Sequence, residues 1–124
     1  MLIDGDLTDL IIGKAVEVHS SLGPGLLESV YEACLAYELT EVGLSVERQK
    51  TLPVRYKNIF LDDGLRMDMV IENRVVIELK CVDKILPVHE AQLYTYLKLS
   101  GNRVGLLFNF YTRYLKDGMK RLVL

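Results

Sequence analysis

The stretch GLRMDMVIENRVVIELKCVDK, residues 64–84, decides the fold of this chain, because two apolar segments in it are separated by a short polar break. LRMDMVI and VVIELKC have the composition of β-strands, and Glu72-Asn73-Arg74 between them suits a turn, so we expect a hairpin. Charged residues nevertheless interrupt both strands, with Asp68 in the first and Glu78 and Lys80 in the second. These charges need an explanation, since burying an isolated charge is costly.

The length of the turn decides whether the charges share one face of the hairpin. Side chains alternate along a strand, so Glu78 and Lys80 project to the same side. A two-residue turn at Asn73-Arg74 would pair Asp68 with Leu79 and point it away from Glu78. A three-residue turn or a bulge would pair Asp68 with Glu78 on one face. A shared site needs the second arrangement, and we therefore predict an odd-length turn or a bulge.

Two adjacent carboxylates repel each other unless a positive charge lies between them. Lys80 could supply that charge, and a salt-bridge triad on an exposed sheet face is one interpretation. Glu28, at the start of a predicted helix, offers a third carboxylate, although an acid there can simply stabilise the helix dipole. An all-oxygen set of this kind is what Mg²⁺ or Mn²⁺ prefers. A lysine beside such an ion can assist a metal-bound water, which predicts phosphodiester hydrolysis.

A second group of polar residues follows the hairpin, where His89, Gln92 and Tyr96 fall on one face of a predicted helix. The Gln92 amide could orient a phosphate or a water, and Tyr96 could donate to a phosphate or stack on a base. The alternative is structural, with Tyr96 at the edge of the core and His89 on the helix surface. Both interpretations stay open at this point.

The remaining pattern predicts the order α-α-β-β-β-α-β around a central mixed β-sheet flanked by helices, an α/β (α+β) class. The first helix starts from Thr8 as N-cap and stops at Gly23-Pro24-Gly25, and the second runs from about Leu26 to Val42. We expect a strand or bent strand pair from Leu44, a turn at Asp62-Asp63-Gly64, a helix from Pro87 to Gly101, a buried strand at residues 104–110 and a small terminal hairpin closed at Asp117-Gly118.

Length and composition limit the number of domains and the class of protein. The 124 residues, half of them hydrophobic, suit a single domain over residues 1–124. We expect a cytoplasmic protein, because the apolar runs are too short to cross a membrane and the acidic N-terminus does not resemble a secretory signal. Cys34 and Cys81 are expected to be reduced.

Charge is distributed unevenly along the chain. The net charge is −2, yet residues 1–47 carry nine acids against one base, and residues 98–124 carry six bases against one acid. The basic end, with Arg103, Arg113 and Lys116, could face phosphates together with His89. Solvated surface charges are the alternative.

The motifs also resemble a known family. GPGLLESVYEACLAYEL carries Gly25, Glu28 and Tyr31 at the positions that name the GxxExxY proteins. MDMVIENRVVIELK resembles the D…ExK core of the PD-(D/E)xK nuclease superfamily, and PVHEAQLYTYLKLSG resembles the Q-x-x-x-Y element of its RecB-like exonuclease branch. The residue before Asp68 is Met67 instead of the proline of the superfamily's name.

The resemblance implies a restriction-endonuclease-like core and a Mg²⁺- or Mn²⁺-dependent nuclease. It implies metal ligands in Glu28, Asp68, Glu78 and the carbonyl of Leu79, a catalytic role for Lys80, and supporting roles for Tyr31, Gln92 and Tyr96. The partner is then nucleic acid, with DNA favoured over RNA. A nuclease-like module that binds nucleic acid or a protein without cutting is the alternative, and apolar surface left over by a small core allows a homodimer.

Overall fold

The protein is described from a computed structural model that places residues 2–124. Its elements are α1 (Gly5–Leu22), α2 (Glu28–Glu41), β1 (Val46–Tyr56), β2 (Ile59–Ile71), β3 (Val75–Lys80), α3 (Pro87–Ser100), β4 (Val104–Asn109), the 3₁₀ helix η1 (Leu115–Gly118) and β5 (Met119–Val123). This is an α+β fold that is consistent with a restriction-endonuclease-like core, and the predicted order of elements is confirmed.

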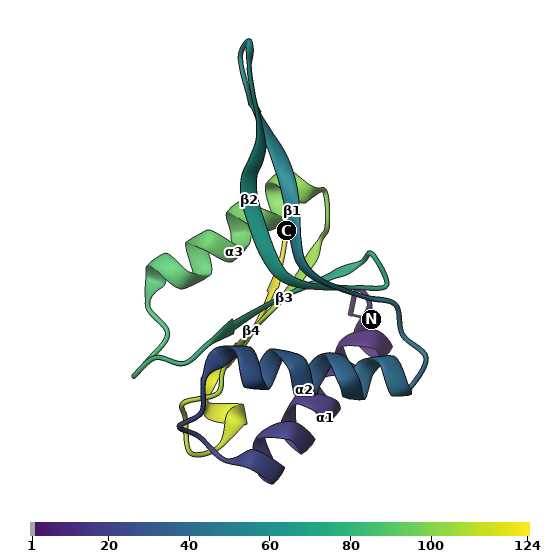
Figure 1. The fold of residues 1–124 in the computed structure, drawn as a ribbon, viewed down its shortest axis with the longest axis vertical. Coiled ribbons are helices and arrows are strands. Elements are labelled where there is room, and N and C mark those ends of the chain that lie inside the picture. Colours follow the sequence, from purple (N-terminus) through teal and green to yellow (C-terminus); the bar gives the residue numbers. More distant parts are fainter. Residues whose placement is uncertain (1) are drawn as a thin grey trace.

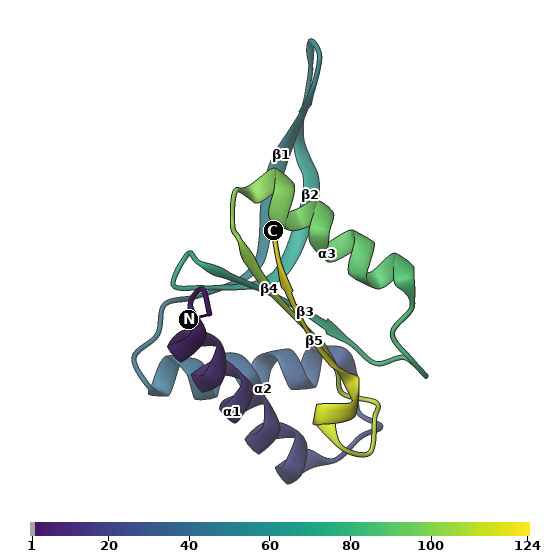
Figure 2. The same cartoon turned by 180° about the vertical axis from the view of Figure 1, so that it is seen from behind.

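The five strands form one mixed sheet in the order β1-β2-β3-β4-β5. Only the β3–β4 pair is parallel. Parallel neighbours need a crossover connection, and α3 provides it. The pair α1 and α2 lies on one side of the sheet and α3 on the other (Figures 1 and 2).

Each side of the sheet has its own core. The larger core lies between the sheet and the helices α1 and α2, and it includes Ile77 and Leu79 of β3. The smaller core lies under α3 and includes Val76 of the same strand. Because side chains alternate along a strand, Glu78 and Lys80 lie on the side of α3, as Val76 does.

The β1–β2 hairpin is longer than the sequence suggested, and the turn predicted at Asp62-Asp63-Gly64 is wrong. Those residues lie inside β2, and the chain reverses at Lys57-Asn58, between the paired residues Tyr56 and Ile59. The register shifts opposite residues 62–64, where β2 has the extra length of a bulge. The outer end of the β1–β2 hairpin extends away from the rest of the molecule (Figure 1). Residues 51–66 of the hairpin are called the arm, and the base of the arm packs on the smaller core through Leu52, Val54 and Leu65.

Two further boundaries differ from the sequence analysis. The first helix begins at Gly5 with Asp4 at the N-cap position, and Thr8 lies buried inside it, where its hydroxyl donates to the Gly5 carbonyl at 3.1 Å. The end of the chain forms no hairpin of its own, because β5 pairs with β4 and covers its otherwise open edge. No helix among residues 2–124 combines the length and the apolar character needed to span a membrane.

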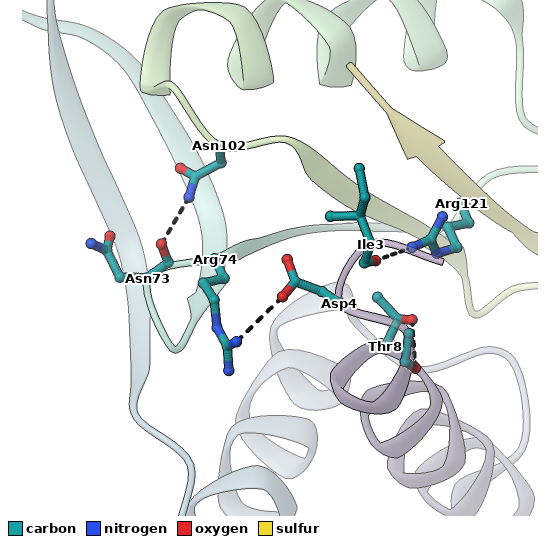
Figure 3. Close-up of polar contacts among 8 residues, drawn as sticks. Ile3, Asp4, Thr8, Asn73, Arg74, Asn102 and Arg121 are labelled. Carbon is teal, nitrogen blue, oxygen red and sulfur yellow. Dashed lines mark hydrogen bonds and ion pairs between the residues drawn. The ribbon is translucent and has the colours of Figure 1, made fainter. Parts of the chain in front are cut away.

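Contacts from three segments hold the turn between β2 and β3 and the start of the chain (Figure 3). Asp4 forms an ion pair with Arg74 at 3.3 Å, and the Asn102 side chain donates to the Asn73 carbonyl at 3.0 Å. Arg121 of β5 donates to the Ile3 carbonyl. The turn is therefore fixed from both of its sides, which stabilises the register of the hairpin.

Candidate active site

The turn between β2 and β3 has three residues, which confirms the predicted odd length. Ile71 pairs with Val75, and the ladder continues to the pair Met69 and Ile77. Glu72 and Asn73 adopt left-handed conformations with φ of 53° and 52°, which close the turn. Beyond Met69 the two strands separate, since β2 continues into the arm while β3 continues alongside β4 (Figure 1).

Asp68 and Glu78 occupy the point where the strands separate. The Asp68 amide donates to Oε1 of Glu78 at 3.2 Å, and the Leu79 amide donates to Oδ2 of Asp68 at 2.8 Å. The side chains thus take over the hydrogen bonds that a continued ladder would have made. The two carboxyl groups lie side by side, as the turn length predicted.

This arrangement strongly raises the pKa of Glu78. Its side chain is almost completely buried, with 4% exposed. Burial, followed by the negative charge of Asp68, raises the pKa of Glu78 to about 9. At neutral pH the carboxyl therefore holds a proton unless a cation binds beside it. A pair of carboxyl groups in this state fits a divalent ion with oxygen ligands, because the ion replaces the proton.

Glu28 approaches this pair from the first residue of α2. Partial burial raises its pKa, the charge of Asp68 raises it further, and the charge of Lys80 lowers it, so the Glu28 carboxylate lies within electrostatic reach of both. Within residues 2–124, however, no three side chains of His, Cys, Asp or Glu are grouped closely enough to hold a metal ion. The compact pair is Asp68 and Glu78, and Glu28 is its neighbour.

Tyr31 explains why α2 starts where it does. Its hydroxyl donates to the Gly23 carbonyl at 2.5 Å and accepts from the Leu26 amide at 3.1 Å. The ring is fully buried and stacks on Phe110, with 4.5 Å between the ring centroids. Tyr31 thereby fixes the loop before α2 from within the core, and this loop sets the position of Glu28.

A chain of hydrogen bonds joins β3 to α3. The Lys80 ammonium donates to Oε1 of Gln92 at 3.2 Å, and the Gln92 amide donates to the Tyr96 hydroxyl at 2.9 Å. Partial burial and the charges of Glu78 and Asp68 raise the pKa of Tyr96. Lys80, Gln92 and Tyr96 thus line one side of the carboxyl pair.

The other predicted residues lie in different surroundings. Nδ1 of His89 accepts the Leu86 amide at 2.9 Å, so this ring caps the start of α3. Arg103 precedes β4 at the end far from Lys80, since Val104 pairs with Val75 and Asn109 with Lys80. Arg113 lies over the Tyr114 ring, 5.2 Å from its centroid, and Lys116 lies in η1. Among these contacts none joins the four residues to the carboxyl pair.

Sequence reasoning missed an ion pair beside the site, between the buried Glu32 and the exposed Arg48. Glu32, one helical turn after Glu28, accepts hydrogen bonds from Arg48 at 3.0 and 3.2 Å and from the side-chain amide of Gln49. This cluster ties α2 to β1, and the Glu32 charge contributes to the raised pKa of Glu28. The spacing of four between the two glutamates was the available signal, because it places both on one helix face.

In this α+β fold, an acidic residue on β2 lies opposite the Glu-x-Lys of β3. A family model of the PD-(D/E)XK nuclease superfamily matches residues 5–122, and the chain belongs to this superfamily. Nucleases of the superfamily generally use divalent metals and act on nucleic acid. No curated protein and no solved structure matches the chain.

Proposed function

We propose that this protein is a Mg²⁺- or Mn²⁺-dependent nuclease that hydrolyses phosphodiester bonds, with DNA favoured over RNA as substrate. The paired carboxyl groups of Asp68 and Glu78 carry the proposal, because the buried Glu78, with a pKa of about 9 beside the partly buried Asp68, favours a cation between the two groups. Glu28 and the Leu79 carbonyl would complete the ligand set. When bound, the ion would supply a Lewis acid that polarises the phosphate.

The roles of the other side chains follow from their contacts. Lys80 would assist the attacking water and stabilise negative charge that develops on the phosphate. Gln92 holds the Lys80 ammonium in place at 3.2 Å and is itself held by Tyr96. Gln92 and Tyr96 are therefore positioning residues in this scheme, and Tyr31 is a structural support for Glu28.

A module that binds nucleic acid or a protein without cutting is the second candidate. The observation in its favour is that the Asp68 carboxylate already satisfies the Leu79 amide, which is a structural role that needs no chemistry. Turnover separates the two candidates.

The test is cleavage of labelled single- and double-stranded DNA and RNA with Mn²⁺, with Mg²⁺ and with chelator. We expect metal-dependent cutting by the wild type, loss of cutting in Glu78→Ala, and unchanged cutting in Glu41→Ala, which removes an exposed acid at the end of α2. Metal binding by calorimetry without any cutting would favour the second candidate.

A further inference from the structure

The two sides of the arm differ in character along β2. Leu65 and Met67 are buried, whereas Arg66 is exposed and Asp68 is only partly buried. Because Leu65 and Met67 both pack in the smaller core, alternation places Arg66 on the other side of the arm from them. Arg66 is two residues from Asp68 along β2, so it is the basic residue of the arm that is nearest to the carboxyl pair along the strand.

The side of the arm that carries Arg66 continues to its end. Arg66 pairs with Thr51 and Arg55 pairs with Phe60, and residues directly opposite each other share a face. On β1, residues 51, 53 and 55 are exposed while 52 and 54 are partly buried, so Thr51 and Arg55 lie on one side. We call this surface, with Arg66, Thr51, Arg55 and Phe60, the site face of the arm.

The arginines of the site face are available for a ligand. Within residues 2–124 the Arg66 guanidinium forms no ion pair or hydrogen bond, and Arg55 uses only Nε, which donates to the Lys57 carbonyl at 3.3 Å. By contrast, Arg48 and Lys50 at the base of β1 are neutralised by Glu32 and Glu47. The charge of Arg66 offsets a small part of the rise in the pKa of Tyr96, so Arg66 lies within electrostatic reach of the candidate active site.

A polyanionic substrate needs cations at this place. The negative charges of Glu28 and Asp68 repel phosphates, so the strand on either side of the cleaved bond must find positive charge nearby. An arginine can bind a phosphate through two parallel hydrogen bonds. Phe60, with 62% of its surface exposed, offers a ring on which an unpaired base can stack.

We propose that the site face of the arm binds a single-stranded segment of the nucleic-acid substrate, with Arg66 on the phosphate nearest the carboxyl pair, Arg55 on a phosphate further out and Phe60 stacked on a base. This inference rests on the proposed function and names its substrate surface. Arg66 and Arg55 are separated by about 13 Å along the arm, at about 3.3 Å per residue. The exposed Asp62 and Asp63 lie beside the outer part, so Arg66 is the stronger contact of the two.

The opposite side of the arm is apolar and suggests what else could bind here. Tyr56, Ile59 and Leu61 are each more than half exposed on that side, and a second copy of the chain could cover them. The charges lie on the site face instead, and they favour nucleic acid there. A second copy on the apolar side would be detected as a dimer in solution.

The test is fluorescence polarisation of a labelled 20-nucleotide single strand and its duplex, with Ca²⁺ and over a range of salt concentrations. We expect Arg66→Ala to weaken binding of the single strand about tenfold and to lower the salt slope by about 0.7, as loss of one phosphate contact requires. Phe60→Ala should weaken binding of the single strand without changing the slope. Lys98→Ala removes the same charge from an exposed position on α3, outside the arm, and is the matched control.

Three results would overturn the inference, and they separate it from the proposed function. If the wild type cuts but Arg66→Ala and Phe60→Ala bind as the wild type does, the arm is not the substrate surface although the nuclease assignment stands. If Lys98→Ala loses as much affinity as Arg66→Ala, the effect is one of net charge. If the wild type neither binds nor cuts, the proposed function fails and the inference fails with it. Analytical ultracentrifugation of Leu61→Ser adds a check of the apolar side. A dimer lost in this variant, together with wild-type nucleic-acid affinity in Arg66→Ala and Phe60→Ala, would assign the arm to a second copy.

Discussion

The amide of Asp68 donates a hydrogen bond to the carboxyl group of Glu78 across the point where β2 leaves β3. Two acidic side chains are thereby held together in a place where one of them is almost fully buried. Such a pair is unfavourable when both members are charged. The protonation state of this pair therefore determines how the stability of the protein responds to pH and to divalent ions.

Stability without metal should fall as the pH rises. The pKa of Glu78 is raised from 4.5 to about 9 in the folded protein, so between these values the folded chain keeps a proton that the unfolded chain releases. Stability from this group is fully present below about pH 4.5 and is lost as the pH rises towards 9. Urea unfolding in chelator between pH 5 and 9 should show this decline. Glu78→Gln, which stays neutral, should flatten the curve, and an unchanged slope in this variant would contradict the assignment.

Divalent ions should stabilise the fold, and more so at higher pH. An ion at the carboxyl pair displaces the Glu78 proton, so its affinity should rise between pH 6 and 8. At an ion concentration about 100 times Kd the expected gain is about 2.7 kcal/mol in the free energy of unfolding. Thermal unfolding with Mn²⁺ measures it. Asp68→Asn should remove the gain, whereas Asp62→Asn on the arm should retain it, and equal gains in both variants would place the ion elsewhere.

Lys80 should be needed for turnover and not for the ion. Lys80→Ala should reduce the cleavage rate by about 10²- to 10⁴-fold, as loss of a group that assists proton transfer does. Calorimetry should show Mn²⁺ binding close to that of the wild type. Lys98→Ala on α3 is the control with the same loss of charge. Cleavage by Lys80→Ala at the wild-type rate would remove this residue from the mechanism.

Loss of the Tyr31 hydroxyl should affect stability and the position of Glu28. Tyr31→Phe retains the stacking on Phe110 but leaves the Gly23 carbonyl and the Leu26 amide without their partner. The expected cost is about 1–3 kcal/mol in the free energy of unfolding. Tyr37→Phe alters an exposed tyrosine on the same helix and should be neutral. A Tyr31→Phe protein as stable as the wild type would show that water replaces the hydroxyl.

The bulge in the arm should depend on Gly64. A Cβ at this position would lie 2.2 Å from Cγ2 of Val54 and 2.8 Å from its backbone nitrogen, so Gly64→Ala must displace the neighbouring strand. We expect destabilisation of about 1–3 kcal/mol. Gly13→Ala is the matched control, since no atom lies within 4 Å of its added Cβ and the change in a helix should be stabilising by about 0.5–1 kcal/mol. Equal effects of the two changes would contradict this account of the bulge.

Local patterns predicted the helices and the central hairpin well because alternation and turn length are short-range properties. The three-residue turn could be derived from the need to place Asp68 beside Glu78, and the structure confirms it. The arm could not be derived in the same way. Asp62-Asp63-Gly64 has a typical turn composition, yet pairing with β1 keeps it in a strand, and only the register of the whole hairpin shows this.

Less of the candidate site could be predicted from the sequence. Glu78 stands in a typical motif, but its burial depends on where β2 separates from β3, which no local pattern encodes. The contact between Glu32 and Arg48 joins residues from two different elements, and no short-range period links them. His89 shows the opposite case, because its contact is local. It accepts a hydrogen bond from the Leu86 amide at the start of its own helix, whereas its chemistry had suggested a contact with nucleic acid.

The turn at Glu72–Arg74 has a consequence for protein engineering. The turn is polar and at the surface, where insertions are ordinarily tolerated. A single added or deleted residue would nevertheless shift the register by one, and every side chain of one strand would then point to the opposite face of the sheet. Asp68 would then leave Glu78, and the apolar residues around it would exchange cores. Loop grafting or circular permutation is therefore better directed to the tip of the arm at Lys57-Asn58, where a change in length leaves the opposed carboxyl groups in register.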